Sequence, residues 1–133
     1  MTEPGKAAPH AQILVVEDDD DVRRLIVRGL TALGVVTAAF DGLDAYERLT
    51  GGLVPDVIVT DLMMPRMDGL ALIQKLKDEG RLTRIPVVML TAKTRATEVV
   101  TGINAGARFY VTKPFEMEAL LSKVRKALAG KGP

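Results

Sequence analysis

The stretch ILVVEDDDDVRRLIVRGL, residues 13–30, joins a short apolar run, five consecutive acids and a helical pattern. Four apolar residues in a row are typical of a strand that is buried on both faces, as in a parallel sheet. The acids at residues 17–21 follow this strand directly, although adjacent like charges repel each other. Beyond them, apolar side chains recur at i, i+3 and i+4 spacing, which predicts an amphipathic helix. These helical positions are Val22, Leu25, Ile26, Leu30 and Leu33.

The same alternation of apolar run and helical pattern continues along the chain. Strands are predicted at residues 12–16, 35–39, 56–60, 86–90 and 108–112. Further helices are predicted around residues 42–50, 72–76, 99–103 and 120–128. This repetition indicates an α/β fold of the (βα)₅ type, in which helices cover both faces of a doubly wound, five-stranded parallel sheet.

Composition and charge fit one ordinary globular domain. Hydrophobic residues make up 47% of the 133 residues and charged residues 26%. The formal net charge of +1 argues against nucleic acid or an anionic membrane as the main partner. The absence of cysteine excludes disulfides and thiolate chemistry. With no signal peptide or membrane span in the sequence, we expect a cytoplasmic protein. We expect His10, the one histidine, to be a solvated bystander in the polar tail.

Residues able to carry chemistry stand where the predicted strands end. These residues are Glu17 and Asp18 after the first strand, Asp61 in VTDLMMPRMDG, Thr91 in MLTAK and Lys113 in YVTKPF. In an open parallel sheet the carboxyl ends of the strands meet at one rim, where binding sites form. We therefore expect carboxylates, a hydroxyl and an ammonium to meet there. The second strand ends in Phe40 and Asp41, a plain helix-start signal.

Three clustered carboxylates need a counterion. A like-charge pair about 4 Å apart costs roughly 4 kcal/mol at an effective dielectric constant near 20. A hard divalent cation removes this cost, and oxygen ligands favour Mg²⁺.

The acids after the first strand are expected to divide their roles, with Glu17 and Asp18 facing the crevice. Asp19 or Asp20 is expected to cap the helix, with Asp21 in its first turn.

Asp61 is the expected reactive group. It opens a loop with turn signals at Pro65 and Asp68-Gly69, so we expect its carboxylate to stand exposed at the mouth of the crevice. A carboxylate beside Mg²⁺ can act as a nucleophile and form an acyl phosphate. Thr91 and Lys113 are suitable partners for the added phosphoryl oxygens. The bond between Lys113 and Pro114 permits a cis geometry that aims the ammonium inward.

Together the motifs ILVVEDD, VTDLMMPRMDG, VVMLTA and YVTKPF closely resemble the receiver domain of two-component response regulators, the CheY-like family. The spacings also fit that family: 43 residues from Asp18 to Asp61, 30 to Thr91 and 22 to Lys113. The resemblance covers residues 11–129, which we take as one receiver domain. Residues 1–10 are then a flexible N-terminal tail, and residues 130–133 a C-terminal tail or the start of a linker.

The resemblance implies a strand order of 2-1-3-4-5 and a phosphorylation-dependent switch. Asp61 would accept a phosphoryl group from the phosphohistidine of a sensor histidine kinase or a histidine phosphotransfer protein. Mg²⁺, for which Mn²⁺ can substitute, would be held by Asp18, Asp61 and the backbone carbonyl of Met63, and through water by Glu17. The chain would be no enzyme beyond its own phosphotransfer and slow autodephosphorylation.

The resemblance also implies a conformational relay. Thr91 would move toward the phosphoryl group, Lys113 would supply the counter-charge, and Tyr110 would turn inward. For Tyr110, a plain buried aromatic is an equally good interpretation. The readout face would be the fourth helix, fifth strand and fifth helix, with Lys123, Arg125 and Lys126 as polar contacts. Met63 and Lys93 would flank the path of a water that attacks the acyl phosphate. Because Met63 cannot hydrogen-bond that water, our hypothesis is a fairly long-lived phosphorylated state.

Three rival functions remain to be weighed. A receiver-like interaction module without phosphorylation has no need of the complete acid, threonine and lysine set. An aspartyl phosphatase usually has a second acid two residues after its nucleophile, where this chain has Met63. A mononucleotide-binding enzyme favours glycines after the first strand, where this chain has acids. Left open are a stand-alone protein or a piece of a longer regulator, a downstream protein target or output domain, and phosphorylation-linked homodimerisation.

Overall fold

The computed structural model of the protein describes residues 11–81, 85–92 and 107–130. Five parallel strands form one sheet in the order β2-β1-β3-β4-β5. The strands are β1 (Gln12–Val16), β2 (Val35–Ala39), β3 (Val57–Asp61), β4 (Val87–Ala92) and β5 (Phe109–Lys113). The helices of the described ranges are α1 (Asp20–Leu30), α2 (Gly42–Thr50), α3 (Gly69–Asp78) and α5 (Met117–Ala129). The helix predicted around residues 99–103 lies outside the described residues.

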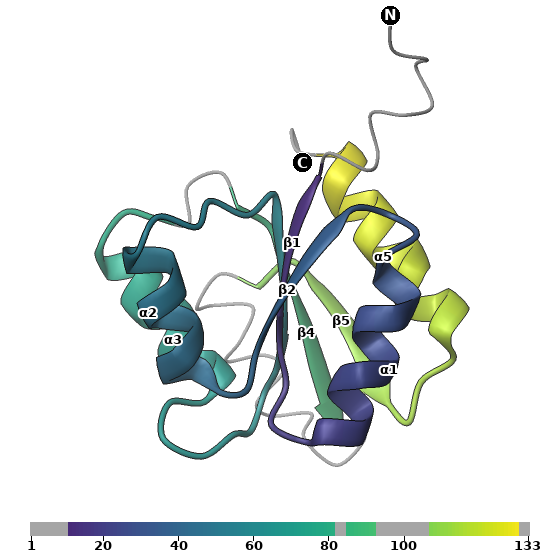
Figure 1. Ribbon diagram of the computed structural model, residues 1–133, viewed down its shortest axis with the longest axis horizontal. Helices are drawn as coiled ribbons and strands as arrows, with labels where there is room; N and C mark the ends of the chain where they lie inside the picture. The colour runs from purple at the N-terminus through teal and green to yellow at the C-terminus, as the bar shows by residue number, and fades with distance from the viewer. Residues whose placement is uncertain (1–10, 82–84, 93–106, 131–133) are drawn as a thin grey trace, which may run out of the picture.

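Helices cover both faces of the sheet, as predicted from the apolar strands. Helices α1 and α5 lie on one face, and α2 and α3 lie on the other (Figure 1). Strand β1 shows how the apolar run serves both layers, because successive side chains point to opposite faces. Ile13 and Val15 pack in the core under α1 and α5, whereas Leu14 and Val16 pack in the core under α2 and α3. The doubly wound fold and its strand order are therefore confirmed.

Three strands end later than predicted, which changes where the site residues stand. Strands β3, β4 and β5 run to Asp61, Ala92 and Lys113, rather than to residues 60, 90 and 112. The parallel ladder continues this far because Asp61 pairs with Leu90, and Ala92 pairs with Lys113. Of the predicted site residues, Asp61, Thr91 and Lys113 therefore belong to the strands themselves, whereas Glu17 and Asp18 follow β1.

Helix α1 is shorter than its apolar pattern predicted, and it buries fewer residues. It ends at Leu30, so Leu33 lies in the turn that follows, although it still packs on the core. The turn is needed because the Val35 amide bonds to the Ala11 carbonyl, which brings β2 beside β1. Leu25 is 53% exposed, because the core contacts the stripe that holds Ile26 and Leu30. None of the helices in the described ranges is long and apolar enough to span a membrane.

Candidate functional site

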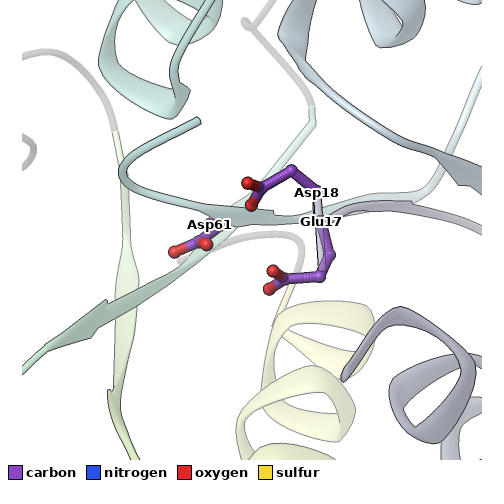
Figure 2. Close-up of side chains that lie close together, drawn as sticks. All are labelled: Glu17, Asp18 and Asp61. Carbon is purple, nitrogen blue, oxygen red and sulfur yellow. The ribbon is translucent and has the colours of Figure 1, made fainter. Parts of the chain in front are cut away.

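Three carboxylates gather where β1 and β3 end (Figure 2). Glu17, Asp18 and Asp61 each place an oxygen within 4.8 Å of the others. Glu17 is buried because its amide extends the sheet by bonding to the Ala39 carbonyl, whereas Asp18 is exposed. The next acid, Asp19, accepts a hydrogen bond from the Val22 amide at 2.9 Å and caps α1. The acidic run therefore divides between a site and a helix cap, as predicted, with Asp19 rather than Asp20 as the cap.

Asp61 is not the exposed loop residue that the sequence predicted. It is the last residue of β3, and only 8% of its surface is exposed. Its Oδ1 atom accepts a hydrogen bond from the Leu62 amide at 2.8 Å, which fixes the orientation of the carboxylate. The prediction failed because the turn signals lie further along the chain, after the strand has ended. The other oxygen, Oδ2, faces Lys113.

Lys113 bridges two of the three carboxylates. Its Nζ atom lies 3.0 Å from Oε1 of Glu17 and 3.0 Å from Oδ2 of Asp61. Its side chain is 27% exposed, so this ion pair is only partly screened by water. The peptide bond that follows Lys113 is cis, the geometry that the sequence permitted. The Lys113 ammonium lies beside the carboxylates at the strand ends, the rim where the sequence predicted it.

The protonation of the site follows from its burial and crowding. Burial and the nearby Asp61 charge raise the pKa of Glu17 to about 7, although hydrogen bonds from the Asp19 amide and Lys113 act against this. Burial lowers the pKa of Lys113. Its hydrogen bonds to Asp61 and Glu17 raise the pKa by more than burial lowers it, so the net shift is upward. Within the part of the chain that the structure describes, three carboxylates face the ammonium of Lys113, and this excess of oxygen donors suits a hard divalent cation.

Thr91 and Tyr110 lie on the strands beyond Asp61. Thr91 is 3% exposed, and its hydroxyl donates to the Ala92 carbonyl at 3.3 Å. Tyr110 pairs with Met89 in the sheet and packs against the core under α2 and α3. Burial raises the pKa of its phenol. Met63 is 45% exposed, and Lys93 lies outside the described residues.

Sequence reasoning missed the role of Asp41. We interpreted it as a plain helix start, and it does cap α2 by accepting a hydrogen bond from the Asp44 amide at 2.9 Å. It also accepts hydrogen bonds from Nε and Nη2 of Arg66, at 2.6 and 3.1 Å. No local pattern indicates a pair whose members are 25 residues apart.

Arg23 is a second missed residue. Its Nη1 atom donates to the Glu17 carbonyl at 2.9 Å, and its Nη2 atom pairs with Asp20. The acid–arginine spacing of three residues in a helix was a usable signal for the second contact. The contact with Glu17 fixes the backbone beside the carboxylate cluster.

Comparison with known proteins gives consistent matches. Residues 13–125 match the family model described as the response regulator receiver domain. The chain is 36% identical over 119 residues to the chemotaxis protein CheY1 of Helicobacter pylori, a match that spans 88% of this chain and 96% of that one. It is 42% identical over 118 residues to the response regulator MprA of Mycobacterium ulcerans, which covers 88% of this chain but only 50% of MprA. The solved receiver domain of the Francisella response regulator 1452 superposes with a TM-score of 0.81 at 31% identity, covering 90% of this chain and 98% of that one.

Proposed function

Because this chain belongs to the family of response regulator receiver domains, which act in two-component signalling, we propose that it is a phosphorylation-dependent switch with Asp61 as phosphoacceptor. One observation carries this proposal: a single ammonium, that of Lys113, is shared by Asp61 and Glu17 at 3.0 Å each. A structural ion pair needs one carboxylate, whereas a phosphoryl site needs both a nucleophile and a cation beside it. The receiver unit of the proposal spans residues 11–129.

The proposed reaction moves a phosphoryl group from histidine to aspartate. An oxygen of Asp61 attacks the phosphorus, an O–P bond forms and the P–N bond to the imidazole breaks. The imidazole nitrogen keeps the bonding electron pair and takes up a proton. The Leu62 amide holds Oδ1, which leaves Oδ2 as the oxygen beside Lys113. Lys113 then offers its ammonium to the new phosphoryl oxygens.

The carboxylate cluster fits a bound Mg²⁺. In the proposal Asp18 and Asp61 are direct ligands, the Met63 carbonyl is a third, and Glu17 acts through water. Asp18 is exposed and can take up an ion directly from solvent, whereas the oxygens of the buried Glu17 already accept hydrogen bonds from the Asp19 amide and Lys113. When bound, Mg²⁺ neutralises the carboxylates and offsets charge on the phosphoryl oxygens, and Mn²⁺ can take its place.

The switch of the proposal runs from Thr91 to Tyr110. Thr91 is buried, and its hydroxyl donates a long hydrogen bond of 3.3 Å to the Ala92 carbonyl of its own strand, so a better acceptor can draw it away. Tyr110 lies on the adjacent strand, β5. We assign the readout to a face formed by about residues 95–127, which include β5 and most of α5. The phosphoryl donor is a sensor histidine kinase or a histidine phosphotransfer protein, and the recipient is a downstream protein or output domain.

The decay of the phosphorylated state belongs to the same proposal. The Met63 side chain is 45% exposed and apolar, so it offers no hydrogen bond to an attacking water. We propose Met63 and Lys93 as the residues that tune this rate, and we expect slow autodephosphorylation. The chain's only chemistry in this view is on its own Asp61.

The test is the intact mass of the protein after incubation with a small-molecule phosphodonor, with and without Mg²⁺. We expect the native chain to gain one phosphoryl group only when Mg²⁺ is present, and Asp61→Asn to gain none. The matched control is Asp21→Asn, which removes an acid from the same run, where the side chain is 94% exposed. This variant should be phosphorylated like the native chain.

Two results would count against the proposal. If the native chain gains no phosphoryl group and binds no Mg²⁺, the cluster would be no phosphorylation site, and the chain would be better explained as a constitutive interaction module. If Asp61→Asn is still phosphorylated, another residue must be the acceptor.

A further inference from the structure

The loop between β3 and α3, residues 62–68, is tied to the turn between β2 and α2. Arg66 binds the carboxylate of Asp41 through two nitrogens, Nε at 2.6 Å and Nη2 at 3.1 Å. The Asp41 side chain is only 4% exposed, whereas that of Arg66 is 49% exposed. A fork of two parallel hydrogen bonds from a guanidinium fixes direction as well as distance. The pair therefore sets where this part of the loop can lie.

Two neighbouring contacts reinforce this pair. The Gly42 amide donates to the Met67 carbonyl at 2.9 Å, and a side chain at Gly42 would overlap that carbonyl. The Arg66 guanidinium also lies 5.6 Å from the centroid of the Phe40 ring, within the range of a cation–π contact. Residues Phe40, Asp41 and Gly42 therefore hold Arg66 and Met67 from one side.

Arg66 adopts a backbone conformation that is unfavourable for its residue type. Its φ is +66°, in the left-handed region that favours glycine. Such a conformation persists only where the surrounding structure determines it, and it concentrates at functional sites. The contacts of the Arg66 side chain are the determinants that the structure provides.

The loop's two ends are fixed as well, which leaves Met63 between anchors. The Leu62 amide bonds to the Leu90 carbonyl, and the Gly69 amide bonds back to the Leu62 carbonyl, both at 2.9 Å. Met63 stands one residue after the first anchor and three residues before Arg66. Its carbonyl is therefore placed by hydrogen bonds on both sides of it along the chain.

We propose that Asp41 and Arg66 are positioning residues for the metal and phosphoryl site, holding loop 62–68 so that the Met63 carbonyl is available as a ligand. This inference rests on the proposed function. Neither residue touches the acyl phosphate or the ion in this proposal. Their effect is to order the ligand before the ion arrives, so that binding does not have to supply the free energy of ordering the loop. Groups that orient a metal ligand typically change metal affinity when they are removed.

The experiment is calorimetric titration of the native chain and its variants with Mg²⁺ alone. Asp41→Asn is the most informative variant, because asparagine caps a helix as well as aspartate does, so that α2 keeps its start while the ion pair is lost. Arg66→Ala removes the pair from the other side, and Arg66→Lys keeps the charge but loses the fork. The control is Arg81→Ala, which breaks an arginine–glutamate pair of 2.9 Å just after α3, where the arginine is about as exposed as Arg66.

We expect Asp41→Asn and Arg66→Ala each to weaken Mg²⁺ binding about tenfold, the lower end of the range for such residues. Arg66→Lys should lie between Arg66→Ala and the native chain, and Arg81→Ala should match the native chain. The double variant should bind no more weakly than Arg66→Ala alone, since the two residues act as one unit. Urea unfolding of the same variants separates this effect from a general loss of structure. A general loss would lower the unfolding midpoints, and the Mg²⁺ affinities would not follow the order given above.

Two outcomes overturn the inference, and they can be told apart. If the native chain binds Mg²⁺ and the folded Asp41→Asn and Arg66→Ala variants bind it equally well, the pair only ties two loops together, while the proposed function stands. If the native chain binds no Mg²⁺, the metal part of the proposed function fails, and this inference fails with it.

Discussion

The Nζ atom of Lys113 lies 3.0 Å from Oδ2 of Asp61, although 52 residues separate them along the chain. The same atom lies 3.0 Å from Oε1 of Glu17, a residue 96 positions away. The ends of β1, β3 and β5 therefore converge on one ammonium. Among the described residues, this cation is shared by two carboxylates, with a third, that of Asp18, close by.

Replacing this cation should destabilise the metal-free protein. In Lys113→Met, Glu17 and Asp61 lose their shared partner while they remain largely buried, which we expect to lower the free energy of unfolding by about 1–3 kcal/mol. Added Mg²⁺ should recover part of the loss, since it restores a counterion. Urea unfolding at pH 7, with a chelator and then with Mg²⁺, measures both effects. Lys126→Met, at an exposed position of α5, is the control. Equal stability of Lys113→Met and this control would show that the bridge contributes little.

The acidic run should respond unevenly to substitution. Asp19 caps α1, so Asp19→Ala should cost about 1 kcal/mol of unfolding free energy. Asp21 is 94% exposed, and Asp21→Ala should change stability by less than about 0.5 kcal/mol. Thermal unfolding of the two variants in one buffer gives the comparison. Similar losses for both would mean that the acids act through bulk charge instead of through a cap.

Two glycines should tolerate alanine very differently. A Cβ at Gly69 would overlap the backbone carbonyl of Asp61, so Gly69→Ala must move either β3 or α3 and should cost about 2 kcal/mol. The atoms nearest to a Cβ at Gly29 belong to the flexible side chain of Met117. In α1 alanine also favours the helix by up to about 1 kcal/mol, so Gly29→Ala should be nearly neutral. Urea unfolding measures both variants. A greater loss at Gly29 would contradict this assignment of close contacts.

The Asp41–Arg66 pair should contribute stability that disappears in acid. Burial raises the pKa of Asp41. Hydrogen bonds from Arg66 and from the Asp44 amide outweigh burial and bring the pKa below its ordinary value of 3.8. As the pH falls, the unfolded chain takes up the proton first, so protonation favours unfolding. We expect Asp41→Asn to be less stable than the native chain by about 1–2 kcal/mol at neutral pH. That difference should persist above about pH 5 and shrink below about pH 4.

Unfolding free energies of the native chain and Asp41→Asn between pH 3 and pH 7, measured without metal, check this expectation. Asp56→Asn is a suitable control, because Asp56 also accepts a backbone hydrogen bond, at 2.7 Å from the Gln12 amide, but it is exposed. A difference between the native chain and Asp41→Asn that grows on acidification would rule out a lowered pKa for Asp41.

Much of the fold could be predicted from local patterns. Apolar runs located all five strands, because a strand that is buried on both faces needs apolar residues at consecutive positions. The helical period located α1, α2, α3 and α5, although it extended α1 to Leu33. The period does not show where the chain must turn, and the turn was decided by the need to bring Val35 beside Ala11. Leu25 was likewise expected on the buried face, but the contacts of the core left it exposed.

The sequence by itself determined which residues stand at the strand ends, because chain order and the right-handed winding of a parallel sheet bring those ends to one rim. It thereby indicated Glu17, Asp18 and Asp61 as a group, with Lys113 at the same rim. Only the tertiary structure decided that Asp61 is nearly buried, that Lys113 is shared by two carboxylates, and that Asp41 is bound by Arg66. The physical reason is range: periodicity and capping act over a few residues, whereas burial and ion pairing depend on how segments far apart in the chain pack together.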